Sequence, residues 1–279
     1  MKLSVLVDNN TFIDSYFYGE PGLSFYIEDK NYKILFDTGY SNIFVENARK
    51  MGIDLLDLDY LVISHGHLDH TWGTVPLIRL YTKARLEKQP HKNPELVLHP
   101  AALYSRVMDD TEIGCLLNYD KLKKHFDVKY TKTPYWLTQN LVFLGEIPRK
   151  FDFENTEPVG KIETSGIYEN DYLIDDSALA YKTSRGIVII TGCSHSGICN
   201  ITEYAKEVCN DSRIIDIVGG FHLQNPSKKQ LKGTVKYMMK LNPKEVHACH
   251  CTDLYSKIEL SKAVRLKEVG AGLQIKYEL

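Results

Sequence analysis

The 279-residue sequence lacks a long hydrophobic run and an early leader-like segment. No stretch approaches the roughly 20 consecutive apolar residues that a membrane-spanning helix needs, so we expect no membrane association. The apolar stretch within residues 1–8 is shorter than that of a secretory signal peptide, and it ends in a charged residue at position 8. We therefore expect a protein of the cytoplasm.

The sequence also lacks an excess of charge of either sign. Its net charge is -2 at pH 7, with 43% hydrophobic and 25% charged residues, which is ordinary for a globular protein. A net charge near zero provides no excess of positive charge that would bind nucleic acid. We expect a small-molecule substrate and no nucleic-acid partner, and the composition defines no oligomeric state.

Cysteine is present without a CxxC pair. Six cysteines in a chain without a secretory signal predict reduced thiols rather than a disulfide framework. Cys193, Cys249 and Cys251 lie close to histidines in the sequence, and a cysteine-rich structural metal site around His250 stays open as an alternative. We expect residues 249–251 to be extended, so that Cys249 and Cys251 point away from His250, which favours His250 alone as the ligand.

The most informative segment is Ser64-His65-Gly66-His67-Leu68-Asp69-His70, which follows an apolar strand predicted at residues 60–63. It places three imidazoles and a carboxylate in six residues, on a loop fixed by a buried strand. These groups suit zinc and related first-row metals. The alternative is a polar loop that contains histidines by chance.

Other histidines follow further predicted strands. In the first half we expect strands at residues 1–9, 23–27 and 33–36 and a helix at 42–51. In the second half we expect strands at 178–181, 186–190, 214–218 and 273–277, a short strand ending at 246, and helices at 199–209, 227–241 and 256–269. Histidines therefore follow four strands: His65, His67 and His70, then His195, His222 and His250. Strand ends at one edge of a sheet converge, and ligands bind there in α/β folds.

The middle of the chain is the least regular part. Short strands are predicted at residues 95–98, 128–130 and 141–144 and a helix at 116–126, whereas residues 148–166 have no clear period. We interpret residues 80–170 as an insertion, a small α+β cap within one domain that spans residues 1–279.

These features together resemble the metallo-β-lactamase superfamily. The resemblance rests on His65-x-His67-x-Asp69-His70, on the preceding Asp37-Thr38-Gly39 and on the later histidines at strand ends. It implies an α/β fold, a four-layer αβ/βα sandwich with metals at one edge. Residues 191–197, 219–223 and 249–252 resemble the branch of metal-dependent hydrolases often labelled dihydropterin-ribofuranosylaminobenzene-phosphate synthases.

The resemblance also implies a ligand set. His65 and His67 would bind one divalent metal with His195, and Asp69 and His70 would bind a second with His250. Asp37 would orient a ligand without binding metal. Zinc is the first candidate, with iron and manganese as alternatives.

One position departs from the family pattern. Many members carry a bridging aspartate in a Thr-Gly-Asp segment, whereas Thr191-Gly192 is followed here by Cys193. Cys193 or His222 replaces the carboxylate, or the second metal binds weakly, so the site holds one or two metals.

The implied chemistry is metal-assisted hydrolysis, in which a metal lowers the pKa of water to about 7. Asp69 would orient the resulting hydroxide, and His222 would protonate the leaving group or stabilise negative charge. We expect a hydrolase of a small, phosphorylated or pterin-like metabolite. The alternatives are a mononuclear iron-dependent redox enzyme and a non-catalytic binding protein; the charge balance disfavours a nuclease.

Overall fold

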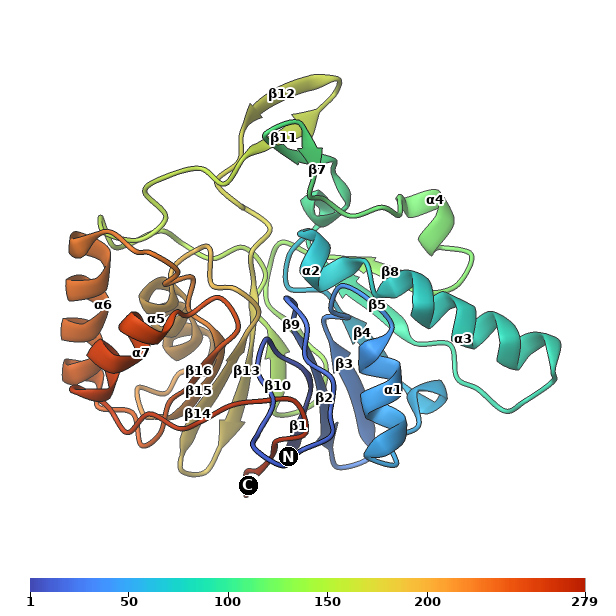
Figure 1. The fold of residues 1–279 in the computed structure, drawn as a ribbon, viewed down its shortest axis with the longest axis horizontal. Coiled ribbons are helices and arrows are strands. Elements are labelled where there is room, and N and C mark those ends of the chain that lie inside the picture. The colour runs from blue at the N-terminus through green and yellow to red at the C-terminus, as the bar shows by residue number, and fades with distance from the viewer. Residues whose placement is uncertain (279) are drawn as a thin grey trace. The chain divides into compact units, whose positions relative to one another are not determined.

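The computed structural model describes residues 1–278, which divide into two compact units (Figure 1). Unit 1 comprises Met1–Thr131, Gly160–Asn170 and Gly270–Glu278, and unit 2 comprises Lys132–Val159 and Asp171–Val269. Each unit is built around a sheet of its own. Within residues 1–278, no helix is long and apolar enough to cross a membrane.

Unit 1 contains a seven-stranded sheet with the strand order β17-β1-β2-β3-β4-β5-β8. Its first part, from β17 to β3, is antiparallel, and the part from β3 to β8 is parallel. The parallel part brings the C-terminal ends of β3 and β4 to the same edge. The strands are β1 (Lys2–Val7), β2 (Ser24–Asp29), β3 (Tyr32–Phe36), β4 (Tyr60–Val62), β5 (Glu95–Leu98), β8 (Asp127–Tyr130) and β17 (Gln274–Lys276).

Helices cover the sheet of unit 1 through a shared apolar core. Phe44 of α1 and Leu77 and Tyr81 of α3 pack in one buried cluster with Leu35 of β3 and Leu61 of β4. This burial is the main stabilising contribution of the unit. The helical segments are α1 (Ile43–Lys50), η1 (Leu55–Asp57), α2 (Leu68–Thr71), α3 (Thr74–Leu86), η2 (Pro100–Leu103) and α4 (Tyr119–Leu122).

Unit 2 contains a six-stranded sheet with the order β16-β15-β14-β13-β10-β9. Strands β14, β15 and β16 are parallel neighbours, so their C-terminal ends lie at one edge. The strands are β9 (Tyr135–Trp136), β10 (Leu141–Phe143), β13 (Ala178–Thr183), β14 (Gly186–Thr191), β15 (Ile214–Gly220) and β16 (His247–Cys249). The helices are α5 (Ile198–Cys209), α6 (Lys228–Leu241) and α7 (Leu254–Ser261).

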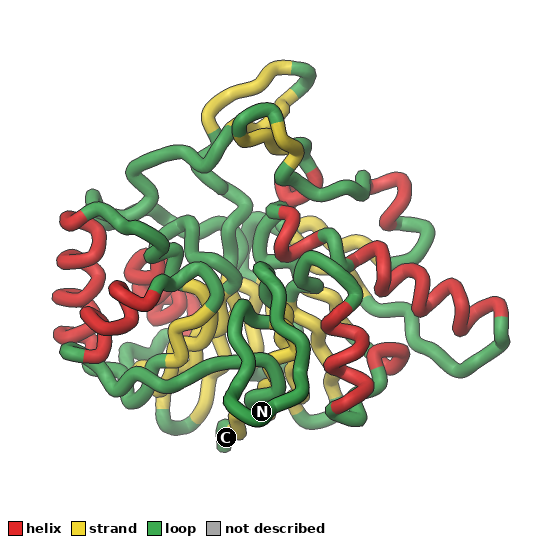
Figure 2. Tube along the Cα trace, viewed as in Figure 1, coloured by secondary structure: helices red, strands yellow, loops and turns green. Residues whose placement is uncertain are grey.

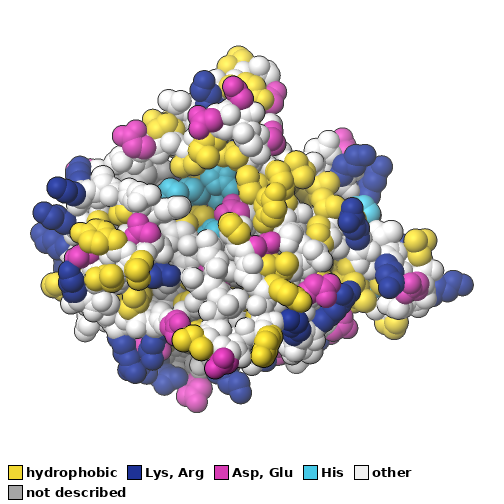
Figure 3. All heavy atoms as spheres, viewed as in Figure 1, with side chains coloured by type: hydrophobic (Ala, Val, Ile, Leu, Met, Phe, Trp, Pro, Cys, Tyr) yellow, Lys and Arg dark blue, Asp and Glu magenta, His cyan; other side chains and the backbone are white. Residues whose placement is uncertain are grey.

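Helix α6 illustrates how the sequence pattern fixes an element of unit 2. Ser227 caps its N-terminus, because the Ser227 side chain accepts a hydrogen bond from the Gln230 N–H at 3.1 Å. Leu231 and Met238 face the core, whereas the lysines of the helix cover its outer surface (Figure 3). This is the ordinary pattern of an amphipathic surface helix.

A third, four-stranded sheet with the order β12-β11-β6-β7 belongs to unit 1 (Figure 2). The strands are β6 (Arg106–Met108), β7 (Thr111–Glu112), β11 (Lys161–Thr164) and β12 (Ile167–Asn170). Residues 80–170, expected as one insertion, therefore contribute strands to all three sheets. Only part of that segment, strands β6, β7, β11 and β12, forms this sheet, which belongs to unit 1.

Two predicted helices are shorter than expected. Helix α7 ends at Ser261 rather than at 269, because Val246 accepts and donates backbone hydrogen bonds with Lys267 and Arg265, which holds that segment extended. In the 116–126 segment only Tyr119–Leu122 is helical. In the segment after α7 a tertiary contact thus overrides a helical sequence pattern.

Candidate metal centre

In unit 1 the candidate residues follow two parallel strands. Phe36 at the end of β3 pairs with Val62 of β4. Asp37 follows the first strand, and the loop with His65 and His67 follows the second. Both histidines are buried, with 0% and 6% of their surface exposed.

Asp37 connects this loop to α2. Its Oδ1 accepts a hydrogen bond from the Ser64 N–H, and its Oδ2 accepts one from the Ser64 hydroxyl, both at 2.7 Å. His70 Nδ1 lies 2.7 Å from the same Oδ2. The carboxylate is fully buried. It therefore fixes the ring of His70 with Nε2 directed away from it, as carboxylates do for metal-binding histidines.

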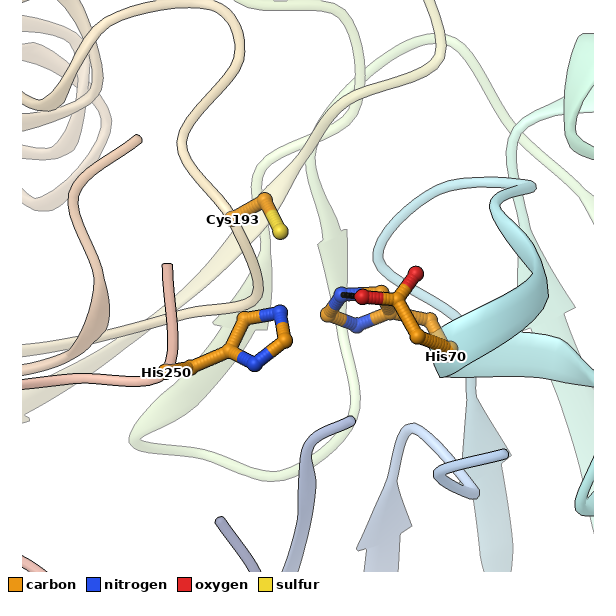
Figure 4. A group of neighbouring side chains, drawn as sticks. His70, Cys193 and His250 are labelled. Atoms are coloured by element: carbon orange, nitrogen blue, oxygen red, sulfur yellow. Dashed lines mark ion pairs between the residues drawn. The ribbon is translucent and has the colours of Figure 1, made fainter. Parts of the chain in front are cut away.

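The four motif side chains of unit 1 are close to one another. The His65 ring lies 4.8 Å from the His67 ring and 4.3 Å from the His70 ring, centroid to centroid. His70 Nε2 is 3.7 Å from Asp69 Oδ2 (Figure 4). Asp69 is the most exposed of the four, with a quarter of its side chain accessible. Imidazole nitrogens and one carboxylate oxygen in this arrangement fit a divalent first-row metal.

A buried arginine that the sequence did not single out supports the same loop. Arg106 is fully buried on β6, and an added Cβ at Gly66 would meet its Nη1 at 2.3 Å. The same Cβ would lie 2.3 Å from the Ala102 carbonyl oxygen. Gly66 is therefore required because other chain segments pack directly against the loop between the two histidines.

In unit 2 the candidate residues follow three parallel strands. Thr191 of β14 pairs with Gly219 of β15, and Gly220 pairs with Cys249 of β16. The loops after these strands carry His195, His222 and His250 respectively. The predicted convergence of the strand ends is thus present within this unit.

The loop that carries His195 is held by buried polar groups. The Asp176 carboxylate accepts hydrogen bonds from the Ser196 N–H at 2.9 Å and the Ser196 hydroxyl at 2.5 Å. Asn155 donates to the His195 carbonyl oxygen at 3.0 Å. Burial raises the pKa of Asp176 above its usual value despite the hydrogen bonds from Ser196.

Glu154 fixes the start of α5 directly after this loop. Its two carboxylate oxygens accept hydrogen bonds from the N–H groups of Cys199 and Asn200, each at 2.9 Å. Gly197 has φ +96°, and an added Cβ would lie 2.2 Å from the Glu154 Oε2. Burial raises the pKa of Glu154. A capping carboxylate and a glycine together set the direction in which the His195 loop enters the helix.

His222 and Cys251 lie beside His195 in the same unit. The rings of His195 and His222 are 4.1 Å apart, centroid to centroid. The His222 N–H donates to Cys251 Sγ at 3.2 Å, and this sulfur lies 3.4 Å from the Cys193 carbonyl oxygen. Burial acts to raise the pKa of Cys251, but hydrogen bonds from Cys193 and His222 and the nearby imidazoles hold it well below its usual range.

The extended conformation expected for residues 249–251 is wrong. His250 has φ +51°, a left-handed conformation, so residues 249–251 are not extended and their side chains do not alternate. Ser194 and His222 have φ +61° and +47°. Strained backbone of this kind clusters at functional sites.

Cys193 and His250 lie close together within unit 2. A ligand atom of each lies within 4.8 Å of the other, and Figure 4 shows their side chains pointing toward one another from neighbouring loops. Cys193 is buried, with 4% of its surface exposed. A thiolate and an imidazole are a normal pair of zinc ligands.

Comparisons with known proteins identify the family of the chain. The family described as the metallo-beta-lactamase superfamily matches residues 18–250. An uncharacterized protein of Methanocaldococcus jannaschii is 30% identical over 263 residues, which cover 93% of this chain and 94% of the relative. A second protein of that organism, named 7,8-dihydropterin-6-methyl-4-(beta-D-ribofuranosyl)-aminobenzene-5'-phosphate synthase, is 27% identical over 267 residues, which cover 90% and 87% of the two chains.

A solved structure also matches almost the whole chain. The crystal structure of a metal-dependent hydrolase of the beta-lactamase superfamily has 30% sequence identity and a TM-score of 0.83, and 99% of each chain is covered. The predicted α/β fold class is confirmed by this match. The chain belongs to the metallo-β-lactamase superfamily.

Proposed function

We propose that this protein is a metal-dependent hydrolase that acts on a small, phosphorylated or pterin-like metabolite. The observation that carries the proposal is the buried Asp37, which orients the His70 ring while Asp69 Oδ2 lies 3.7 Å from His70 Nε2. A buried carboxylate that fixes an imidazole beside a second carboxylate is typical of a metal ligand set.

The proposed ligands form two sets. His65, His67 and His195 would bind one metal. Asp69, His70 and His250 would bind the second. Support comes from the superfamily, from the burial of the histidines and from their position after parallel strands.

We assign the place of the missing bridging aspartate to Cys193 rather than to His222. Cys193 has a ligand atom within 4.8 Å of one from His250, whereas His222 lies with its ring against that of His195. His222 is partly exposed. It is therefore placed to contact substrate, and its role is to protonate the leaving group.

The bound metals supply a lowered pKa for water and polarisation of the bond that is cleaved. Asp69 holds and orients the attacking water through its partly exposed carboxylate. The buried Asp37 and Asp176 keep the two loops in fixed positions, so that little reorganisation is needed during the reaction.

The substrate class rests on the relatives. One curated relative is named as a synthase whose product contains a dihydropterin, a ribofuranosyl group and a phosphate. A solved relative is described as a metal-dependent hydrolase. A small molecule that combines a fused ring with a phosphoester agrees with both descriptions.

The test is hydrolysis of a panel of phosphomonoesters, phosphodiesters, cyclic phosphates, carboxylic esters and amides. We expect turnover of one class, loss of turnover after chelator treatment and recovery on adding Zn²⁺, Mn²⁺ or Fe²⁺. His67→Ala should abolish the turnover while the fold is retained.

The matched control is His91→Ala, an exposed histidine of unit 1. Its activity should equal that of the unmodified protein. Turnover that survives both chelation and His67→Ala would contradict the proposal, and so would metal-loaded protein without activity on any class.

A further inference from the structure

Two loops of unit 1 are joined directly beside the motif histidines. Thr38 donates to the His70 carbonyl oxygen through its N–H and through its hydroxyl, both at 2.9 Å. The Gly73 N–H donates to the Gly39 carbonyl oxygen at 3.1 Å. Tyr40 directly follows Gly39, and Trp72 lies between His70 and Gly73, so these contacts bring the two aromatic residues together.

Tyr40 and Trp72 form a stacked aromatic pair. Their ring centroids are 5.1 Å apart and their planes are inclined by 26°. The Trp72 indole N–H donates to the Gly114 carbonyl oxygen at 2.8 Å, which fixes the ring. Glu20 fixes the other partner, because its Oε1 accepts the Tyr40 N–H at 3.0 Å.

The pair lies next to Asp69 and remains open to solvent. Trp72 directly ends α2, three residues after Asp69, so the two side chains project from the same side of this helical turn. Tyr40 is 44% exposed and Trp72 is partly exposed. The two rings are already held in place before a ligand binds. A flat ligand that stacks on them therefore immobilises few side-chain rotamers, and little conformational entropy is lost on binding.

We propose that Tyr40 and Trp72 form the binding platform for a planar fused aromatic ring of the substrate. The proposal deepens and rests on the proposed function, since the platform flanks the assigned ligands Asp69 and His70. Stacking on the platform holds the ring, and the bond to be cleaved extends from the ring toward Asp69. The pair selects the substrate without reacting with it.

The experiment measures the binding of pterin, a flat fused ring, by calorimetry and by quenching of tryptophan fluorescence. The chain contains two tryptophans. In a Trp136→Phe background, Trp72 is the only tryptophan, and excitation at the red edge of the absorption band selects it over the tyrosines. We expect saturable quenching, and we expect Tyr40→Leu to weaken binding by roughly 5- to 150-fold, the range for stacking on an aromatic side chain.

Controls separate stacking from a general effect on folding. Tyr40→Phe should bind pterin as tightly as the unmodified tyrosine, and Tyr16→Leu, which removes a remote exposed tyrosine of the same unit, should have no effect. Tetrahydropterin, with a puckered second ring, should bind more weakly than pterin. No saturable binding at millimolar pterin overturns the proposal, and so does equal affinity in Tyr40→Leu protein with an unchanged melting temperature.

The two proposals fail in different ways. Binding is measured without turnover, whereas the proposed function is tested by metal-dependent hydrolysis. If hydrolysis is metal-dependent but indifferent to Tyr40→Leu and pterin does not bind, only the platform is overturned. If pterin binds on Tyr40 but chelation leaves hydrolysis unchanged, the metal-dependent function is overturned.

Discussion

Replacing Asp37 by asparagine is the most informative single change in unit 1. Asparagine has nearly the same shape and tolerates the left-handed backbone, φ +58°, at this position. The carboxylate accepts three hydrogen bonds, two from Ser64 and one from His70 Nδ1. An amide has one oxygen and one NH₂ group, so it cannot accept at all of these positions.

Both orientations of the amide are unfavourable. If the NH₂ group faces His70 Nδ1, it donates there and favours the tautomer with hydrogen on Nε2, the nitrogen assigned to the metal. If it faces the Ser64 N–H instead, two donors meet, and a buried unsatisfied donor costs about 1–3 kcal/mol. Loss of such an orienting partner lowers metal affinity about 10- to 100-fold, or about 1.4–2.8 kcal/mol.

The assay is competition for Zn²⁺ against a chromophoric chelator, paired with urea unfolding. We expect Asp37→Asn to bind metal about 10- to 100-fold more weakly. Asp14→Asn is the matched control, because Asp14 is exposed and has the same φ of +58°. Metal affinity and stability both equal to those of the unmodified protein would refute the orienting role of Asp37.

Three further predictions concern the loops. Gly66→Ala places a Cβ 2.3 Å from the Ala102 carbonyl oxygen and from Arg106 Nη1. It should therefore lower the free energy of unfolding, measured by urea titration, by about 1–3 kcal/mol. An unchanged free energy of unfolding would contradict the close packing around Gly66. Burial raises the pKa of Glu154, so the folded protein binds this proton more tightly than the unfolded chain and loses stability as pH rises above the usual value of 4.5. Glu154→Gln should reduce that loss in urea titrations across pH, and a difference from the unmodified protein that does not vary with pH would contradict it. Cys193→Ala should lower the metal content by about one ion per chain in elemental analysis and Cys193→Asp should restore it; full metal content in Cys193→Ala protein would remove the thiol from the ligand set.

The sequence predicts the scaffold of the site well because local rules determine it. The spacing His65-x-His67 after a short apolar strand, and the histidines after β14, β15 and β16, follow from strand periodicity and from parallel pairing. The fold class is what the resemblance to the metallo-β-lactamase superfamily implies, and the match to a solved structure confirms it.

Other features depend on contacts that no local pattern encodes. Arg106 reaches Gly66 from a strand forty residues later in the chain, and Tyr40 meets Trp72 only because two loops share backbone hydrogen bonds. The direction of Cys251 depends on the left-handed conformation of His250, which is uncommon for a residue other than glycine. Such conformations are imposed by the surrounding fold.

The central claim is that the motif histidines hold a metal. The most direct test is elemental analysis of protein purified without added metal or chelator, for the unmodified chain, His67→Ala and the control His91→Ala. The account predicts close to two divalent metals per chain in the unmodified and His91→Ala proteins and a clear loss in His67→Ala. Metal-free unmodified protein, or full metal content in His67→Ala protein, would contradict it.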